Sequence, residues 1–329
     1  MLIEVDKTQL IKAITIADSV VSSKSINTLL TQCLFSITKD TLVITGTDNE
    51  IGIKTDIDVV ADESGSFTLS GKRLVNLLKE FPDGIIVLEV NGYNVSISSK
   101  SGLVKGQYIM VGASAEEYPV IRDFSYTNAI EIEPKTLYEM LSKTVHAAAN
   151  DSVKPIFNGV YVSSEAEKSL TVVATDSRRL SMMRKDTKGN VTLKEGVIIP
   201  LKTVNELLHI LNEHDTCLIE FDESRCHVKS GRTEIVSRLI DGQFPDYKQV
   251  IPNDYLLKSV VEVKRLKEAL NRIKIFTNEP SWRILLKFSS NVLVIEASYP
   301  DQGEGREEVP IESDANETVT VGINVQFLL

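Results

Sequence analysis

Near the N-terminus, the stretch Lys7-Thr-Gln-Leu-Ile-Lys-Ala-Ile-Thr-Ile-Ala-Asp-Ser-Val-Val21 has the spacing of an amphipathic helix. Its apolar side chains recur every three or four residues on one face: Leu10, Ile14, Ala17 and Val21. Residues 134–149 and 264–277 carry the same stripe. The interval from Leu10 to Leu137 nearly equals the interval from Leu137 to Leu266. A near-constant period of domain length predicts one structural unit that occurs three times.

A second series of helices is expected between the first three. Residues 70–82 and 200–211 share an apolar stripe, and a short apolar strand precedes each. The interval from Leu74 to Val204 repeats the period of the first series. Residues 319–329 repeat the strand and the start of this helix, and there the sequence ends. We therefore expect two helices in each complete unit and a third unit that lacks its second half.

The remaining sequence is typical of short strands rich in β-branched residues. Examples are residues 37–44, 85–90, 93–98, 170–175 and 292–298. The predicted fold class is α+β, with repeated domains at 1–124, 125–252 and 253–329, the last of them incomplete. The alternative, three unrelated α+β domains, would require five helices to align at one period by accident, so we favour repetition.

The composition excludes several classes of protein. Thirty-six basic residues stand against 46 acidic ones, a formal net charge of −10, which disfavours nucleic-acid binding unless the bases gather on one surface. The acidic start does not resemble a signal peptide, and no apolar run is long enough to span a bilayer. We expect a cytoplasmic protein that does not bind membranes, whose three cysteines are buried thiols.

The most specific strings resemble a known family. They are Pro155-Ile-Phe-Asn-Gly-Val, Thr171-Val-Val-Ala-Thr-Asp-Ser-Arg-Arg-Leu and Asp241-Gly-Gln-Phe-Pro-Asp-Tyr-Lys-Gln-Val-Ile-Pro. Together they resemble the bacterial sliding clamps, the β subunits of DNA polymerase III, and the resemblance runs the whole length of the chain. It implies a processivity factor of DNA replication, in which a head-to-tail homodimer of three-domain subunits forms a ring around duplex DNA. Antiparallel sheets would then lie outside, and paired helices would line the hole.

Sliding requires attraction to phosphates without the reading of bases. The repeated helices carry suitable basic residues, and the resemblance adds two positions in loops. The predicted contacts to double-stranded DNA are Lys24, Lys72, Arg73, Lys79, Lys135, Lys143, Lys154, Lys202, Lys264, Arg265, Lys267 and Arg272. Any single lysine could instead lie on the solvent-exposed face of an ordinary helix and make no contact with DNA.

The resemblance also implies a hydrophobic pocket, between the second and third domains, for short peptides of partner proteins. The expected partners are the catalytic subunit of DNA polymerase III, the clamp loader, repair polymerases and mismatch-repair proteins. Matching positions are Phe157, Thr175, Ser177, Arg178, Arg179, Leu180, Pro245, Gln249 and Val250. Ser177 and Gln249 depart from the family's usual glycine and basic residue, and the alternative role for the apolar members is packing.

For ring closure, the resemblance implies contact between the first domain of one copy and the third domain of another. The matching positions are Leu103, Ile275, Phe276, Glu304, Glu307 and Glu308, with Lys100 and Lys105 as possible partners of the glutamates. Phe276 also fits the helix stripe, so a core role is the alternative.

Nothing in the sequence favours an enzyme. It contains no GxSxG, HExxH, P-loop or dinucleotide motif, and its four histidines lack metal-ligand spacing. Asp176 could be a general base, but a carboxylate at the end of a strand more commonly stabilises a turn. We therefore expect no metal and no cofactor. The main competing hypothesis is a peptide-binding scaffold that does not encircle DNA.

Overall fold

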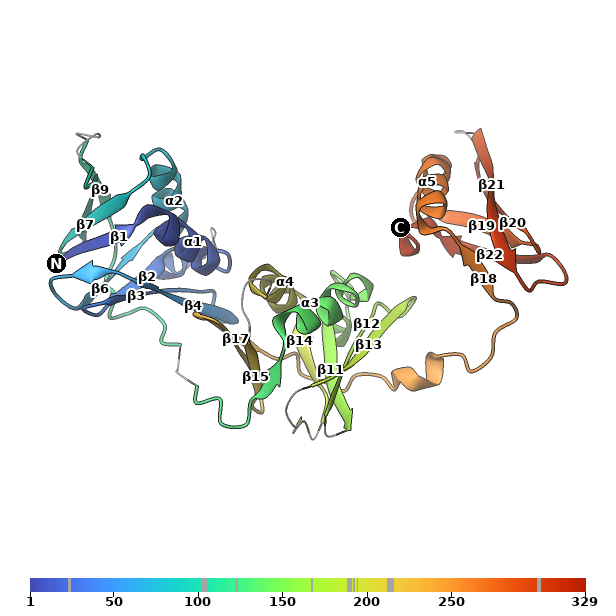
Figure 1. Ribbon diagram of the computed structural model, residues 1–329, viewed down its shortest axis with the longest axis horizontal. Coiled ribbons are helices and arrows are strands. Elements are labelled where there is room, and N and C mark those ends of the chain that lie inside the picture. The colour runs from blue at the N-terminus through green and yellow to red at the C-terminus, as the bar shows by residue number, and fades with distance from the viewer. Residues whose placement is uncertain are drawn as a thin grey trace. The chain divides into compact units, whose positions relative to one another are not determined.

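The computed structural model describes residues 1–22, 25–101, 106–121, 124–166, 168–187, 191, 193, 195–211, 216–300 and 303–329. The chain divides into a first unit, Met1–Phe244, and a second unit, Pro245–Leu329. The first unit contains the first predicted repeat and the second as far as Phe244 (Figure 1). The second unit contains the third predicted repeat and also residues 245–252, which the sequence analysis assigned to the second.

The five predicted helices are confirmed, although most end earlier than the apolar stripe suggests. They are α1 (Lys7–Asp18), α2 (Gly71–Lys79), α3 (Pro134–Ser142), α4 (Leu201–Ile210) and α5 (Val263–Ile273). Short 3-10 turns follow or lie between them: η1 (Thr28–Thr31), η2 (Val145–Ala147), η3 (Pro155–Phe157), η4 (Tyr247–Val250), η5 (Lys274–Phe276) and η6 (Val325–Phe327). None of the helices within the described ranges is long and apolar enough to cross a membrane.

The strands form three corresponding sets. The first repeat contains β1 (Leu2–Asp6), β2 (Cys33–Ile37), β3 (Thr41–Thr47), β4 (Ile51–Asp58), β5 (Val60–Ala61), β6 (Gly65–Leu69), β7 (Ile85–Asn91), β8 (Asn94–Ser99) and β9 (Tyr108–Val111). The second contains β10 (Ile130–Ile132), β11 (Gly159–Ala166), β12 (Ser169–Thr175), β13 (Leu180–Asp186), β14 (Val197–Pro200), β15 (Cys217–Phe221), β16 (Arg225–Ser230) and β17 (Thr233–Arg238). The third contains β18 (Ser259–Val261), β19 (Arg283–Phe288), β20 (Val292–Tyr299), β21 (Gly303–Ser313) and β22 (Val319–Asn324).

The expectation of a single strand over residues 37–44 was wrong. β2 ends at Ile37 and β3 begins at Thr41, and the backbone N–H of Thr38 donates to the carbonyl of Thr41 at 2.9 Å. The polar pair Lys39-Asp40 forms the turn of a hairpin, because both side chains can remain in water there.

The sheet topology confirms the repetition. One antiparallel quartet has the same order in every repeat: β4-β3-β2-β6, β13-β12-β11-β14 and β21-β20-β19-β22. A second quartet occurs in the first two repeats as β1-β7-β8-β9 and β10-β15-β16-β17. In the third repeat its only described strand is β18, which pairs with β21 as β1 pairs with β5.

Pairing between β4 and β17 joins the first two repeats. These strands are antiparallel, with Ile53 opposite Ile235, and they make one eight-stranded sheet from two quartets. The buried hydroxyls of Thr55 and Thr233 lie 3.1 Å apart across this junction. On the helix side, Ser19 Oγ donates to Glu206 Oε2 at 2.6 Å. The two repeats therefore form one unit.

Helix α1 packs closely on its sheet because a glycine of β3 faces it. α1 contacts α2, β3 and β4, and its Leu10, Ile14 and Ala17 are fully buried. At Gly46 on β3 the approach is closest: a Cβ there would lie 1.9 Å from the carbonyl oxygen of Ala17. The backbones of α1 and β3 thus leave no room for a side chain at this position.

The three cysteines are free and buried, as predicted. Burial raises the pKa of Cys217 to about 12 and raises the pKa values of Cys33 and Cys226 well above the ordinary range of a thiol. Thiolate is the reactive form, so these side chains are protected both by packing and by protonation.

We predict that Gly46→Ala lowers the free energy of unfolding by about 2–3 kcal/mol, because α1 must move away from β3. Urea denaturation measures the change. Gly65→Ala is the matched control, since the neighbour of its Cβ is the flexible sulfur of Met1 at 3.1 Å. Equal stability of the two variants would contradict the packing described.

We also predict that, at pH 8, the three thiols of the native protein react with a thiol reagent much more slowly than an exposed cysteine does. All three thiols react once urea unfolds the chain. Absorbance with Ellman's reagent measures both states, and rapid labelling of one thiol in the native protein would show that its site opens.

Candidate functional site

The predicted DNA-contacting residues lie mainly on the helices, on the side away from the core. On α2, the burial of Leu74 and Leu78 turns Lys72, Arg73 and Lys79 outward. The other described members are exposed as well: Lys135, Lys143, Lys154, Lys202, Lys264, Arg265, Lys267 and Arg272. Lys24 lies outside the described residues.

Four of these bases already have an acidic partner. The pairs are Lys143–Glu139 (2.7 Å), Lys202–Asp48 (2.5 Å), Arg265–Glu262 (2.7 Å) and Arg272–Glu307 (2.6 Å). Exposed ion pairs contribute little net free energy, so a phosphate can replace the carboxylate at low cost. Within the described ranges six candidates form no ion pair: Arg73, Lys79, Lys135, Lys154, Lys264 and Lys267. These six provide positive charge that is not locally neutralised.

The turn between β12 and β13 carries five of the predicted pocket residues. Asp176 Oδ1 accepts the backbone N–H groups of Arg178 (2.9 Å) and Arg179 (3.0 Å), and its Oδ2 accepts Nε of Arg179 at 3.1 Å. Thr175 Oγ1 donates to the carbonyl of Arg179 at 2.6 Å. Ser177 has φ +74°, a left-handed conformation. This network holds the turn in one shape and confirms the turn-stabilising role predicted for Asp176.

The same turn occurs between β3 and β4, which sequence reasoning missed. Asp48 Oδ1 accepts the N–H groups of Glu50 and Ile51, both at 2.9 Å, and Asn49 has φ +75°. The other carboxylate oxygen of Asp48 accepts Nζ of Lys202 on α4. The Thr-Asp pair at 47–48 recurs at 175–176, at the same period as the helices, so the repeat contained the signal.

The remaining predicted pocket residues lie in both units. Phe157 is buried at the end of η3 in the first unit. Pro245, Gln249 and Val250 lie at η4 in the second unit, where Val250 is exposed and Gln249 Nε2 donates to Asp246 at 3.0 Å. The peptide-binding role of the full set stays a prediction.

The predicted interface residues of the third repeat divide into two groups. Ile275 is exposed, whereas Phe276 is half-buried over Gly305, whose added Cβ would lie 2.6 Å from the ring. Glu307 accepts both Nε and Nη2 of Arg272, and Glu308 pairs with Arg306 at 2.7 Å. Glu304 is exposed, and Leu103 and Lys105 lie outside the described residues. Lys100 pairs with Glu4 of its own repeat.

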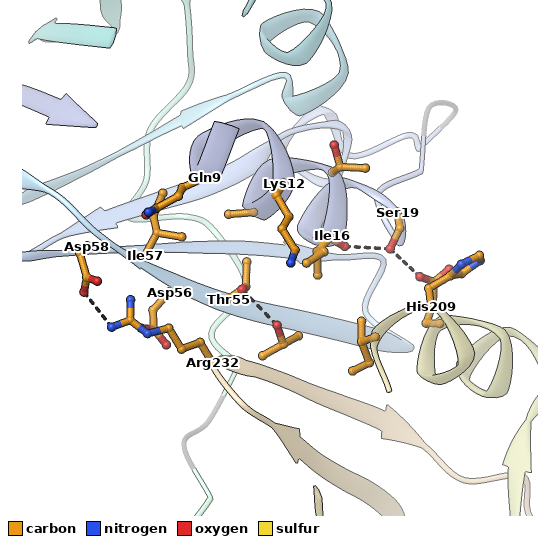
Figure 2. Close-up of a pocket in the computed structure, with 15 residues that line it drawn as sticks. Gln9, Lys12, Ile16, Ser19, Thr55, Asp56, Ile57, Asp58, His209 and Arg232 are labelled. Atoms are coloured by element: carbon orange, nitrogen blue, oxygen red, sulfur yellow. Dashed lines mark hydrogen bonds and ion pairs between the residues drawn. The ribbon is translucent and has the colours of Figure 1, made fainter. Parts of the chain in front are cut away.

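A groove of about 710 Å³ lies between α1 and α4, above β4 and β17 (Figure 2). Its wall includes Ile16 and Ile57, and Arg232 on its rim pairs with Asp58 at 2.8 Å. None of the predicted site residues lines it, and its walls come from α1 and β4 of the first repeat and from α4 and β17 of the second. In the part of the chain that the structure describes, no cluster of His, Cys, Asp or Glu could hold a metal ion.

Comparisons with known proteins agree along the whole chain. Residues 1–122, 131–246 and 248–329 match the N-terminal, central and C-terminal domain families of the DNA polymerase III beta subunit. The beta sliding clamp of Pseudomonas aeruginosa is 27% identical over 99% of this chain and 88% of its own length. That of Synechococcus elongatus is 29% identical over 87% and 77%.

Solved structures give the same result. The crystal structure of the Pseudomonas aeruginosa beta subunit superimposes with a TM-score of 0.92 at 27% identity, covering 100% of this chain and 89% of that one. The beta subunit of Thermotoga maritima gives 0.89 at 27% identity, covering 100% and 88%.

The triplicated α+β units, with their basic helices, define a DNA clamp. The chain belongs to the DNA polymerase III beta subunit family. It is thus a processivity clamp of DNA replication and not an enzyme.

For the two equivalent turns we predict an order of stability. Asp176→Ala removes the acceptor of two backbone N–H groups and lowers the free energy of unfolding by about 1–2 kcal/mol. Asp48→Ala loses more, because its ion pair with Lys202 at 2.5 Å joins two repeats, whereas the pair of Asp176 with Arg179 at 3.1 Å lies within one turn. Asp176→Asn loses least, because its amide oxygen still accepts. Urea denaturation of the three variants measures the order, and an unchanged Asp176→Ala midpoint would exclude this role for the carboxylate.

Proposed function

We propose that two copies of the chain close head to tail around duplex DNA, slide along it without reading its sequence, and tether replication and repair proteins. The observation that carries this proposal is the exposed basic surface of the repeated helices in a protein of net charge −10. Mobile phosphate contacts attract DNA at every register, whereas hydrogen bonds to bases would hold the ring at one place.

The junction inside the first unit supports the head-to-tail arrangement. There β17, the last strand of a second quartet, pairs with β4, the edge of a first quartet. By the repeat, β9 corresponds to β17 and β21 corresponds to β4. β9 is an edge strand with exposed Ile109 and Val111, and an exposed apolar edge favours pairing with another strand. We propose that β9 of one copy pairs with β21 of the other.

The proposed partners follow from family membership and from the turn at Thr175–Leu180. They are double-stranded DNA, the DNA polymerase III catalytic subunit, the clamp loader, repair polymerases and mismatch-repair proteins, all in the cytoplasm. The turn supports peptide docking because its own hydrogen bonds hold it in place, so little conformational freedom is lost on binding.

We predict that the protein, loaded onto DNA by a clamp loader, remains on circular duplex DNA and leaves linear DNA of the same sequence through its ends. Gel filtration of labelled protein with each DNA measures retention. A linear DNA blocked at both ends by bound protein is the control, and it restores retention.

Equal, salt-sensitive loss from all three DNAs would contradict encirclement. It would favour the competing hypothesis of a peptide-binding scaffold, and binding of a partner peptide to the same preparation would then support that hypothesis directly.

A further inference from the structure

The segment that connects the first two repeats runs from β9 to β10, and the structure describes its residues 112–121 and 124–129. It crosses the eight-stranded sheet on the face opposite α1 and α4, which we call the outer face (Figure 1). Gly46 on β3 faces α1, and Gly52 on β4 is paired with the next residue of β3, so it points to the outer face. A Cβ at Gly52 would lie 2.3 Å from Cδ1 of Ile121, so the connecting segment lies directly on β4.

Two anchors hold the connecting segment on either side of Val120. Tyr118 is 3% exposed, and its hydroxyl donates to the carbonyl of Gln32 at 3.1 Å. On the other side of Val120, the side chain of Ile121 fills the space above Gly52. Val120 itself is 88% exposed. An apolar side chain is thus held in water by a backbone that is already ordered, so little conformational freedom is lost when a partner covers it.

A cavity of about 340 Å³ opens beside Val120 on the outer face. Its apolar wall consists of Ile51, Val236 and residues 119–121 of the connecting segment. The volume lies at the lower end of the range for ligand sites, which suits one or two amino-acid side chains. A single exposed valine needs no explanation, but a fixed one at the rim of an apolar cavity indicates a contact point.

Two arginines that repel each other line the same cavity. Arg225 on β16 lies directly opposite Arg238 on β17, and like charges in this position destabilise a sheet. Glu50 pairs with Arg238 at 3.3 Å, but both side chains are more than half exposed, so this ion pair contributes little free energy. Arg225 forms no ion pair with any residue that the structure describes. The pair of arginines therefore leaves positive charge available for an anion.

The charge of the cavity indicates which anion fits. Its charged side chains are two arginines and one glutamate, which leave one net positive charge. This charge matches a single carboxylate, which the planar group of an arginine binds through two parallel hydrogen bonds. It does not match a nucleic-acid backbone, because binding of successive phosphates needs several basic residues. The apolar wall beside the arginines suits an aliphatic side chain close to that carboxylate.

We propose that this cavity binds an acidic peptide segment of a partner protein. The carboxylate of an aspartate or glutamate pairs with Arg225 and Arg238, and a neighbouring leucine or isoleucine fills the cavity against Val120. The site lies within the first unit and shares no residue with the pocket predicted around the turn at Thr175–Leu180. The proposal goes beyond the proposed function, because it requires neither closure of a ring nor contact with DNA.

Short synthetic peptides test the proposed chemistry. The probes are fluorescein-labelled peptides that carry one glutamate and one leucine, separated by no, one or two glycines. Fluorescence anisotropy with the full chain measures their affinity. In matched peptides glutamine replaces the glutamate, and the affinity is expected to fall about tenfold, because a hydrogen-bonded charge is lost.

Variants of the chain test the named residues. Arg225→Gln and Arg238→Gln are each expected to bind the glutamate peptide about tenfold more weakly, and Val120→Ser about threefold. The controls are Arg283→Gln, an exposed arginine without an ion pair in the described part of the chain, and Val60→Ser, an exposed valine of β5. Both controls should coincide with the wild type. Thermal melting of all variants verifies that the fold is retained.

A benzophenone group beside the leucine of the peptide locates the site, and it is expected to cross-link to the connecting segment, β16 or β17. Cross-linking to the turn at Thr175–Leu180, equal affinity for the glutamate and glutamine peptides, or no measurable binding of any glutamate peptide would each overturn the proposal. Tighter binding of a labelled single-stranded oligonucleotide, lost in Arg225→Gln, would overturn it in favour of a phosphate site. Retention on circular DNA is measured separately, so none of these results would affect the proposed function.

Discussion

The backbone pairing of β4 with β17 is the interaction on which the rest of the structure depends. An edge strand presents unpaired N–H and C=O groups, and these groups favour pairing with another strand. In the first unit, β4 of one repeat and β17 of the next satisfy each other's unpaired groups, so two four-stranded sheets become one eight-stranded sheet. An edge of the same type recurs at β9, and β21 corresponds to β4 in the third repeat, where β18 pairs only with its residues 311–313. The proposed pairing of two copies would therefore use the same kind of backbone contact as the junction inside the first unit.

The helices were predictable because their information is local. Stripes such as Leu10 to Val21 require only a period of about 3.6 residues, and five of them were found at their places. Strand partners were not predictable, since the pairing of β4 with β17 joins residues of different repeats that lie far apart in the sequence. The hairpin at Lys39-Asp40 was missed because the flanking β-branched residues outweighed a two-residue polar turn.

The candidate sites show the same division. The apolar face of each helix is buried, so the basic residues on the opposite face are exposed, and the exposure of Lys72 and Lys79 could be predicted from the sequence. The acidic partners of the basic residues could not be predicted in this way. Glu307, predicted at an interface, forms a bidentate pair with Arg272 of the same repeat, a contact that the sequence did not suggest, and its interface role stays a prediction. Some of the acidic residues thus lie beside the basic ones and reduce the positive potential at four of the predicted DNA-contacting side chains.

The paired turns at Asp48 and Asp176 show how duplicated parts acquire different tasks. In both turns, two backbone N–H groups donate to one oxygen of the aspartate, and the hydroxyl of the preceding threonine donates to a carbonyl across the turn, so each turn is closed by its own residues. The second carboxylate oxygen takes a different partner in each turn. That of Asp48 accepts from Lys202 of the next repeat, and that of Asp176 accepts from Arg179 of the same turn. Duplication of a self-contained motif leaves one carboxylate oxygen free to take a new partner, so one copy of the turn fastens two repeats together while the other fastens only itself.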